Sequence, residues 1–172
     1  MTSESLQSDN SKKLYRKLPA WLSSYERQII STMPLNAKWE QGRQGTGYEK
    51  ASLMDEVSAR WVVQRALDTL GGPTRYDAWL LHYPVGSEIT PHTDEAEESM
   101  CHIRLNSLVV ASAGGMLCLD GEELALTDGD AYIFRPDTIL HSVAAVKEQL
   151  RLVLSVGANV EHEHAQALGL TK

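Results

Sequence analysis

The residues with the greatest capacity for chemistry lie in two separate segments of the chain. His92 and Asp94 lie in the first, within ITPHTDEA, and His141 lies in the second, within FRPDTILHSVAAV. Side chains at positions i and i+2 of an extended chain project to the same face, about 7 Å apart along the strand. His92 and Asp94 can therefore bind one metal ion together, although a His-x-Asp pair on its own also occurs in solvated loops.

A third metal ligand is needed from a distant strand, and His141 is the candidate. It follows a turn at residues 135–137 and precedes an apolar stretch, which places it at the mouth of a barrel rather than in its middle. Two imidazoles and one carboxylate form the facial triad of non-haem ferrous oxygenases. Such a triad leaves coordination positions open, and open positions are what a cosubstrate and dioxygen require.

Arg151 is the fourth element, ten residues after His141, and it begins an otherwise apolar strand. Burying an unpaired guanidinium is costly, so we expect this side chain to meet an anion. Its planar fork of donors suits a carboxylate. The alternative is a guanidinium that reaches solvent from the end of the strand.

The composition is that of one ordinary globular domain. The chain has 172 residues, of which 42% are hydrophobic and 23% charged, and its formal net charge is -7. This length is enough for one core, and the acidic balance argues against polymeric nucleic acid as a partner. No apolar run reaches the roughly 20 residues that span a bilayer. Two cysteines, Cys101 and Cys118, give no disulfide framework, which favours a reducing, cytoplasmic location.

The predicted elements change in type near Pro73. Before it, amphipathic spacing predicts helices over about 19–33 and 54–70, separated by a glycine-rich loop. After it, seven or eight short strands with close turn signals predict a sandwich or a jelly-roll barrel. We therefore predict a mainly β, α+β fold. Its parts are a flexible N-terminus (1–13) and a single domain (14–172), which consists of helical support (14–72), an eight-stranded barrel core (73–157) and a C-terminal tail (158–172).

The order His92-x-Asp94, His141, Arg151 within one β-rich stretch resembles the iron(II)/2-oxoglutarate-dependent dioxygenase superfamily. The resemblance covers residues 76–157. Further features resemble its prolyl-hydroxylase-like branch and small bacterial and phage oxygenases. These features are Tyr83-Pro84-Val85-Gly86, Arg104, Gly114-Gly115, Gly129-Asp130 and Phe134.

The resemblance implies a double-stranded β-helix, the jelly-roll, cupin-like barrel of that superfamily. Iron would bind to His92, Asp94 and His141. The cosubstrate 2-oxoglutarate would chelate the iron and place its distal carboxylate on Arg151 and the Tyr83 hydroxyl. Dioxygen would convert 2-oxoglutarate to succinate and carbon dioxide while a prime substrate is hydroxylated.

Two positions depart from the patterns of related branches. Some branches carry Arg-x-Ser, whereas Val153 lies two positions after Arg151. Tyr83 is therefore the expected partner of the cosubstrate carboxylate, with Ser155 as a weaker candidate. The branch that demethylates nucleic-acid bases carries a second arginine six positions after the first. Gly157 occupies that position here, which argues against base demethylation.

His102, Arg104 and Asn106 are further candidates to contact cofactor or substrate, because they alternate on one face of a predicted strand. That face either points into the barrel or forms an outward polar surface. In the first case, Leu108 and Val110 would fill the closed end of the barrel.

The glycine-rich loop carries a possible substrate-binding group, Arg43, Gln44, Thr46 and Tyr48. Its glycines would allow it to move and to close over the site as a lid. The alternative is an ordinary solvated loop.

The leading hypothesis is a hydroxylase that uses Fe(II), 2-oxoglutarate and O2 on a small molecule, an amino acid or a protein side chain. Basic residues at the mouth, Arg43, Lys50 and Arg104, could accept an anionic group. Three alternatives are open: a non-catalytic cupin-like binding module, a zinc hydrolase, and an oxygenase that acts on a nucleobase. A hydrolase has no use for Arg151, and a binding module does not need an open triad together with a carboxylate fork. The sequence defines neither the prime substrate nor the oligomeric state.

Overall fold

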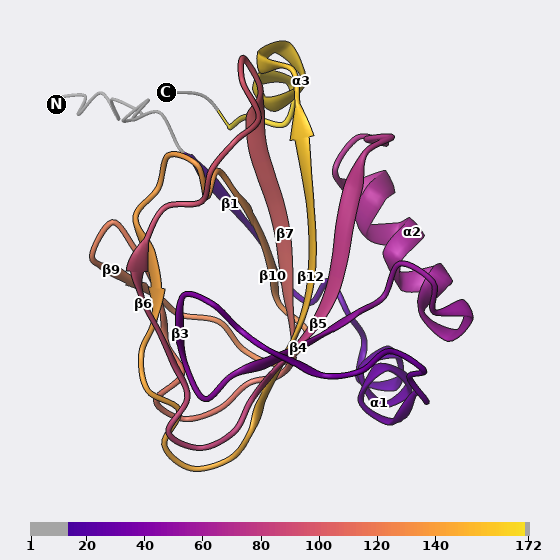
Figure 1. The fold of residues 1–172 in the computed structure, drawn as a ribbon, viewed down its shortest axis with the longest axis vertical. Helices are drawn as coiled ribbons and strands as arrows, with labels where there is room; N and C mark the ends of the chain where they lie inside the picture. The colour runs from indigo at the N-terminus through magenta and orange to yellow at the C-terminus, as the bar shows by residue number, and fades with distance from the viewer. Residues whose placement is uncertain (1–13, 171–172) are drawn as a thin grey trace, which may run out of the picture.

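The computed structural model describes residues 14–170, so the predicted flexible N-terminus (1–13) lies outside the described residues. Two antiparallel sheets face each other, as in a jelly roll (Figure 1). The larger sheet has the strand order β1 (Tyr15–Leu18), β10 (Ala131–Phe134), β7 (Cys101–Val110), β12 (Arg151–Val160), β5 (Tyr76–Tyr83), β4 (Glu49–Ser52) and β2 (Glu40–Gln41). The smaller sheet has the order β3 (Gly45–Thr46), β6 (Glu88–His92), β11 (His141–Val143), β8 (Leu117–Leu119) and β9 (Glu122–Leu124).

The predicted β region contains eight strands, β5 to β12, as expected, but across the residues that the structure describes the two sheets do not close into a barrel. Across residues 14–170 the two sheets keep free edges, β1 and β2 in the larger sheet and β3 and β9 in the smaller. Strands from the region predicted as helical support extend both sheets, because β1 pairs with β10, β4 with β5, and β3 with β6. These strands have two to four residues, too few to show an alternating pattern in the sequence.

Helices α1 (Ser24–Thr32) and α2 (Arg60–Thr69) lie on the outer side of the larger sheet, away from the smaller one (Figure 1). A 3-10 turn, Val57–Ala59, precedes α2, and α3 (His162–Ala167) follows β12 in the region predicted as a tail. Helix α1 begins later than predicted, because a capping box formed by Ser23 and Glu26 sets its first turn. Within residues 14–170, no helix is long and apolar enough to cross a membrane.

Strand alternation gives the larger sheet two different faces. Ile103 and Leu105 of β7 pack on the helix side, in the same cluster as Val62 of α2. Leu108 belongs instead to a cluster between the two sheets, together with Val153 of β12. Because alternate side chains of a strand point to opposite faces, one apolar core fixes the sheet to the helices and leaves the other face free to carry polar groups.

A β-bulge changes this alternation at the end of β7. The register with β12 passes from Leu152–Val110 to Val153–Leu108, which leaves one extra residue, Val109, in β7. Val110 therefore packs against the helix-side core. The prediction that Val110 fills the closed end between the sheets is wrong, whereas Leu108 does lie between the sheets.

Candidate metal centre and cavity

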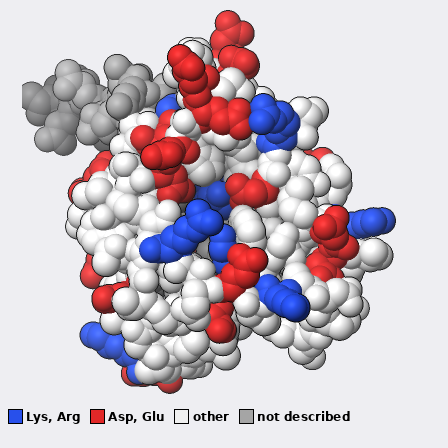
Figure 2. All heavy atoms as spheres, in the orientation of Figure 1, with Lys and Arg blue, Asp and Glu red and all other residues white. Residues whose placement is uncertain are grey.

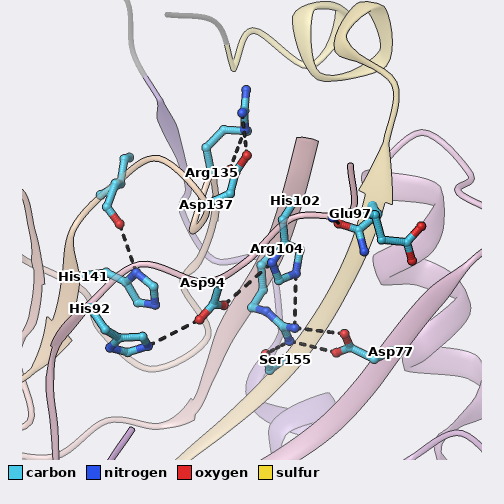
Figure 3. Close-up of polar contacts among 12 residues, drawn as sticks. Asp77, His92, Asp94, Glu97, His102, Arg104, Arg135, Asp137, His141 and Ser155 are labelled. Atoms are coloured by element: carbon cyan, nitrogen blue, oxygen red, sulfur yellow. Dashed lines mark hydrogen bonds and ion pairs between the residues drawn. The ribbon is translucent and has the colours of Figure 1, made fainter. Parts of the chain in front are cut away.

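Two neighbouring strands of the smaller sheet bring the three predicted metal ligands together. His92 ends β6 and His141 begins β11, and the two residues are direct partners in the antiparallel pair, with ring centroids 4.2 Å apart. Asp94 follows β6, and its backbone N–H donates to the Pro136 carbonyl at 2.9 Å. The candidate ligand atoms of the three side chains all lie within 4.8 Å of one another (Figure 3).

Backbone carbonyls orient both imidazoles toward a common centre. His92 Nδ1 lies 2.7 Å from the Thr90 carbonyl, and His141 Nδ1 lies 3.1 Å from the Ile139 carbonyl. A carbonyl only accepts hydrogen bonds, so each Nδ1 carries a proton, and in the neutral form of each imidazole Nε2 keeps its lone pair for a metal. Metal-binding histidines are held in this way by a partner on the second nitrogen. The donor set therefore fits a divalent metal.

The electrostatics of the site favour an ionised carboxylate. Burial by itself would raise the pKa of Asp94, but the hydrogen bond from His92 and the positive potential of His141 and Arg104 outweigh it and lower the pKa to about 2. Burial lowers the pKa of His141. The hydrogen bond with Asp94 raises the pKa of His92. The charge of Asp94 is thus present over the whole ordinary pH range.

The triad opens into a cavity of about 710 Å³ between the two sheets. Figure 2 shows basic side chains gathered at the centre of this face of the molecule, with acidic side chains around them. The cavity wall includes all the residues predicted to bind metal or cosubstrate or to contact substrate, apart from Thr46: Arg43, Gln44, Tyr48, Tyr83, His92, Asp94, His102, Arg104, Asn106, His141, Arg151 and Ser155.

Arg151 is a buried residue of the cavity wall. It is 2% exposed, its Nε atom has no hydrogen-bond partner, and no Asp or Glu within residues 14–170 forms an ion pair with it. It is the register partner of Tyr83, and its guanidinium lies 4.9 Å from the centre of that ring. Gly115 leaves room for its stem, since a Cβ atom there would lie 3.0 Å from Arg151 Cδ. A buried guanidinium with this environment is suited to an anionic ligand.

Two buried tyrosines also line the cavity, and the sequence indicated only one of them. Tyr132 of β10 accepts a hydrogen bond from Asn106 Nδ2 at 2.8 Å. Burial raises the pKa values of both Tyr83 and Tyr132, so both hydroxyls stay protonated and can donate to an anion. Tyr132 could have been identified from its position two residues before Phe134, on the same strand face.

The face of β7 predicted to point inward does line the cavity with His102, Arg104 and Asn106. Arg104 already has partners there: it donates to Ser155 Oγ at 2.8 Å and to Asp77 Oδ2 at 3.0 Å. Ser155 therefore supports Arg104, which leaves Arg151 as the guanidinium with open donor capacity.

The glycine-rich segment forms a hairpin-like edge rather than a free loop. Arg43 and Gln44 line the cavity mouth, and the Gln44 carbonyl accepts from the Thr90 backbone N–H at 3.0 Å. Tyr48 is buried and stacks on Tyr83, with centroids 5.3 Å apart. Thr46 pairs with β6 and does not line the cavity. The lid movement predicted for this segment stays a prediction, and it would require the contacts of residues 44–46 with β6 to break.

The mouth also contains residues that the sequence analysis did not bring together as a group. Lys50 of β4 and Trp79 of β5 lie on the wall, and the Lys50 ammonium is 4.0 Å from the centre of the Trp79 ring. Glu40 and Glu95 also line it. Lys50 was predicted at the mouth, whereas Glu40 is placed there by a two-residue edge strand that no sequence motif marks.

The fold is similar to that of 2-oxoglutarate- and iron-dependent oxygenases. A viral collagen prolyl hydroxylase from Paramecium bursaria Chlorella virus 1, solved with 2-oxoglutarate, is 14% identical, with a TM-score of 0.61 over 86% of this chain and 97% of that one. A Pseudomonas putida prolyl-4-hydroxylase is also 14% identical, with a TM-score of 0.61 over 90% and 96%. HygX from Streptomyces hygroscopicus, solved with nickel, 2-oxoglutarate and hygromycin B, is 8% identical, with a TM-score of 0.70 over 88% and 85%.

No protein-family model and no curated protein sequence matches this chain. Because the sequence identities to these solved structures are low, their similarity supports the fold alone. It confirms the resemblance to prolyl-hydroxylase-like oxygenases at that level, and the reaction has to be argued from the residues of the site.

Proposed function

We propose that this protein is an Fe(II)- and 2-oxoglutarate-dependent oxygenase. The observation that carries the proposal is one cavity that contains both a His92–Asp94–His141 donor set and the buried, unpaired guanidinium of Arg151. A non-catalytic module or a zinc hydrolase would explain the donor set alone. The shared fold with 2-oxoglutarate oxygenases supports the same assignment.

In this proposal the chain's residues have distinct tasks. His92, Asp94 and His141 hold the iron, and Arg151 neutralises the distal carboxylate of 2-oxoglutarate. The Tyr83 hydroxyl donates a second hydrogen bond to that carboxylate. When bound, iron and 2-oxoglutarate supply a dioxygen-dependent oxidation that releases succinate and carbon dioxide and adds one oxygen atom to the substrate.

The prime substrate is proposed to be a small molecule, an amino acid or a protein side chain that reaches the metal through the mouth. Basic and acidic groups are both present there, Arg43, Lys50, Glu40 and Glu95, which suits a polar or zwitterionic group. An action on nucleobases is the weaker alternative, because the position of the second arginine of base demethylases is Gly157. We further propose that residues 14–172 form one domain and that the protein is cytoplasmic.

The direct test is anaerobic addition of ferrous iron and 2-oxoglutarate to the metal-free protein. A visible charge-transfer band is expected from a metal-chelated 2-oxo acid. Admission of oxygen together with a panel of amino acids, peptides and nucleosides should then yield succinate, and mass spectrometry should detect a gain of one oxygen in the substrate. A mixture that stays colourless would favour a binding module or a hydrolase.

The metal ligands can be tested separately from turnover. Asp94→Ala and His141→Ala are each expected to lose most iron binding while the fold persists, because both side chains lie at the cavity rather than in the apolar core. Iron content after reconstitution and far-UV circular dichroism measure the two properties. Iron affinity equal to that of the wild type in either variant would contradict the triad.

A further inference from the structure

His102 lies between the candidate ligand Asp94 and the guanidinium of Arg104 (Figure 3). The His102 residue is 8% exposed, and its Nδ1 atom has no hydrogen-bond partner. That Nδ1 lies 3.8 Å from Asp94 Oδ2, while Asp94 Oδ1 lies 3.4 Å from His92 Nε2. The two oxygens of the carboxylate therefore face different neighbours: Oδ1 faces the metal-binding imidazole and Oδ2 faces His102.

The surroundings of His102 determine which of its nitrogens carries the proton. Arg104 Nη2 lies 3.4 Å from His102 Nε2, and a guanidinium can only donate hydrogen bonds. His102 Nε2 must therefore present its lone pair to Arg104. A neutral imidazole has a single N–H, so the proton lies on Nδ1, the atom nearest Asp94 Oδ2. A hydrogen bond between these two atoms requires a rotation of the carboxylate that shortens the 3.8 Å separation.

Arg104 is held firmly in the position that this arrangement requires. Ser155 Oγ and the Asp77 carboxylate accept its N–H groups at 2.8 Å and 3.0 Å. Its guanidinium also lies directly over Gly157, where a Cβ atom would come within 2.6 Å of Arg104 Cζ. Glycine at position 157 thus provides the space for this side chain.

We propose that His102 is a positioning residue that reserves one oxygen of Asp94 for the metal, and that Arg104 fixes the His102 tautomer that does so. The inference rests on the proposed metal centre and extends it to two residues that are not ligands. With Oδ2 engaged by an N–H, Asp94 binds through Oδ1 alone and leaves more of the coordination sphere to other ligands. Removal of such a supporting contact typically weakens metal binding by about 10- to 100-fold.

The first test uses the metal-free, full-length protein and does not depend on activity. Two-bond ¹H–¹⁵N correlation spectra distinguish Nδ1–H from Nε2–H imidazoles, and the His102 signals are identified by their loss in His102→Gln. The Nδ1–H form is expected in the wild type. In Arg104→Met, His102 should shift toward the Nε2–H form. A wild-type His102 in the Nε2–H form would overturn the proposal.

The second test measures Mn²⁺ affinity from the electron paramagnetic resonance signal of the free ion. His102→Phe and Arg104→Met should raise the Kd by about 10- to 100-fold. His102→Gln should retain most of the affinity, because an amide can accept from Arg104 and donate to Asp94. Equal affinities in the wild type, His102→Phe and His102→Gln would overturn the positioning role.

Gly157→Ala is the sharpest variant, because it removes no polar group. The new methyl group displaces the Arg104 guanidinium, so the Mn²⁺ Kd should rise although residue 157 is no ligand. Arg27→Met is the matched control, since it removes an arginine from an ion pair with Asp128 outside the cavity and should leave the Kd unchanged. Unchanged binding in Gly157→Ala would contradict the proposal. Absence of Mn²⁺ binding in the wild type would instead overturn the metal centre itself.

Discussion

At the scale of single residues, the cavity is notable for polar atoms that lack partners. Arg151 Nε, Asn106 Oδ1 and His102 Nδ1 are buried without a hydrogen bond, and all three residues line the same cavity. An unsatisfied buried donor or acceptor carries a desolvation cost of about 1–3 kcal/mol, or more when it is charged. An acceptor oxygen of an anionic ligand would satisfy the donor Arg151 Nε and recover that part of the cost, whereas the acceptor Asn106 Oδ1 requires a donor group.

Arg151→Gln should separate binding of cosubstrate from binding of metal. The substitution leaves a buried carboxylate of 2-oxoglutarate without its countercharge, at a cost of about 2–5 kcal/mol. Half-saturation by 2-oxoglutarate should therefore rise by about thirtyfold to several thousandfold. The iron content should not change, because the three ligands lie on other strands. Succinate production during a 2-oxoglutarate titration of the iron-loaded variant measures the effect.

Arg151→Lys tests the same interaction and should have a smaller effect than Arg151→Gln. It keeps the charge but loses the planar fork, so its half-saturation should lie between those of the wild type and Arg151→Gln. Arg27→Gln, which alters an arginine on the helix side, serves as the control. Unchanged half-saturation in Arg151→Gln would show that another cation of the cavity, Arg104 first, binds the carboxylate.

At the scale of elements, the site residues were predicted correctly where their spacing along an extended chain determines which side chains share a face. His92 ends β6 and Asp94 follows two positions later, while His141 and Arg151 begin β11 and β12, so their convergence was predicted from strand periodicity and from the family resemblance. Lys50 was expected at the mouth, but Glu40 and Trp79 escaped prediction as neighbours of the site. Glu40 comes from a two-residue strand whose pairing depends on tertiary packing, and no local pattern in the sequence encodes that pairing.

The first residue of helix α1 was predicted wrongly, and the cause is also local. The helix expected from Pro19 begins only at Ser24, since the strand β1 continues to Leu18 and Ser23 caps the helix. Amphipathic spacing locates a helix but does not fix its first residue, which depends on side-chain hydrogen bonds at the cap.

Asp130 joins β10 to the chain segment between β1 and α1, and its carboxylate should be a large contributor to stability. It accepts from the backbone N–H groups of Ala20 and Thr127 at 2.9 and 3.0 Å and pairs with Lys17 at 3.1 Å. Burial would raise its pKa, but these contacts lower the pKa from 3.8 to about 2. Asp130→Asn should therefore reduce the free energy of unfolding at pH 7 by about 2 kcal/mol.

The pH dependence of this effect has a definite sign. Because the folded-state pKa of Asp130 is depressed, its contribution is complete above the unfolded pKa near 4 and is lost as the pH falls toward 2. The difference between wild type and Asp130→Asn in urea unfolding should thus be smaller at pH 3 than at pH 7. The exposed neighbour Asp128 offers a control, Asp128→Asn, with a smaller expected effect. A difference that grows on acidification would refute the assignment.

At the scale of the whole molecule, the candidate ligands are divided between the two sheets. His92 and His141 belong to the smaller sheet, and Arg151, Tyr83 and Tyr132 belong to the larger one. The sheets keep free edges across the described residues, and side chains of both sheets line the cavity between them. A metal with its 2-oxo acid would connect the two sheets through polar contacts that the protein by itself does not make.

Because the metal ligands and the residues that bind the cosubstrate carboxylate lie on different sheets, we expect thermal stability to rise in two steps on ligand binding. A ligand at about 100 times its Kd stabilises the folded state by about 2.7 kcal/mol. For a chain of this size that corresponds to a rise in Tm of about 5–10 °C. We expect one increment with Ni²⁺ alone, which avoids oxidation, and a second when 2-oxoglutarate is added, as measured by differential scanning calorimetry.

Two variants test which sheet is responsible for the Ni²⁺ increment and which for the 2-oxoglutarate increment in Tm. Asp94→Ala should lose both increments, because 2-oxoglutarate chelates the metal that this variant fails to hold. Arg151→Gln should keep the Ni²⁺ increment and lose most of the second, since the metal ligands of the smaller sheet are intact while the carboxylate partner of the larger sheet is gone. Succinamate, which replaces one carboxylate with an amide and lacks the 2-oxo group, should give no second increment in the wild type. If Arg151→Gln kept the full 2-oxoglutarate increment, Arg151 would not be the partner of the cosubstrate carboxylate, and the proposed bridge between the sheets through Arg151 would be wrong.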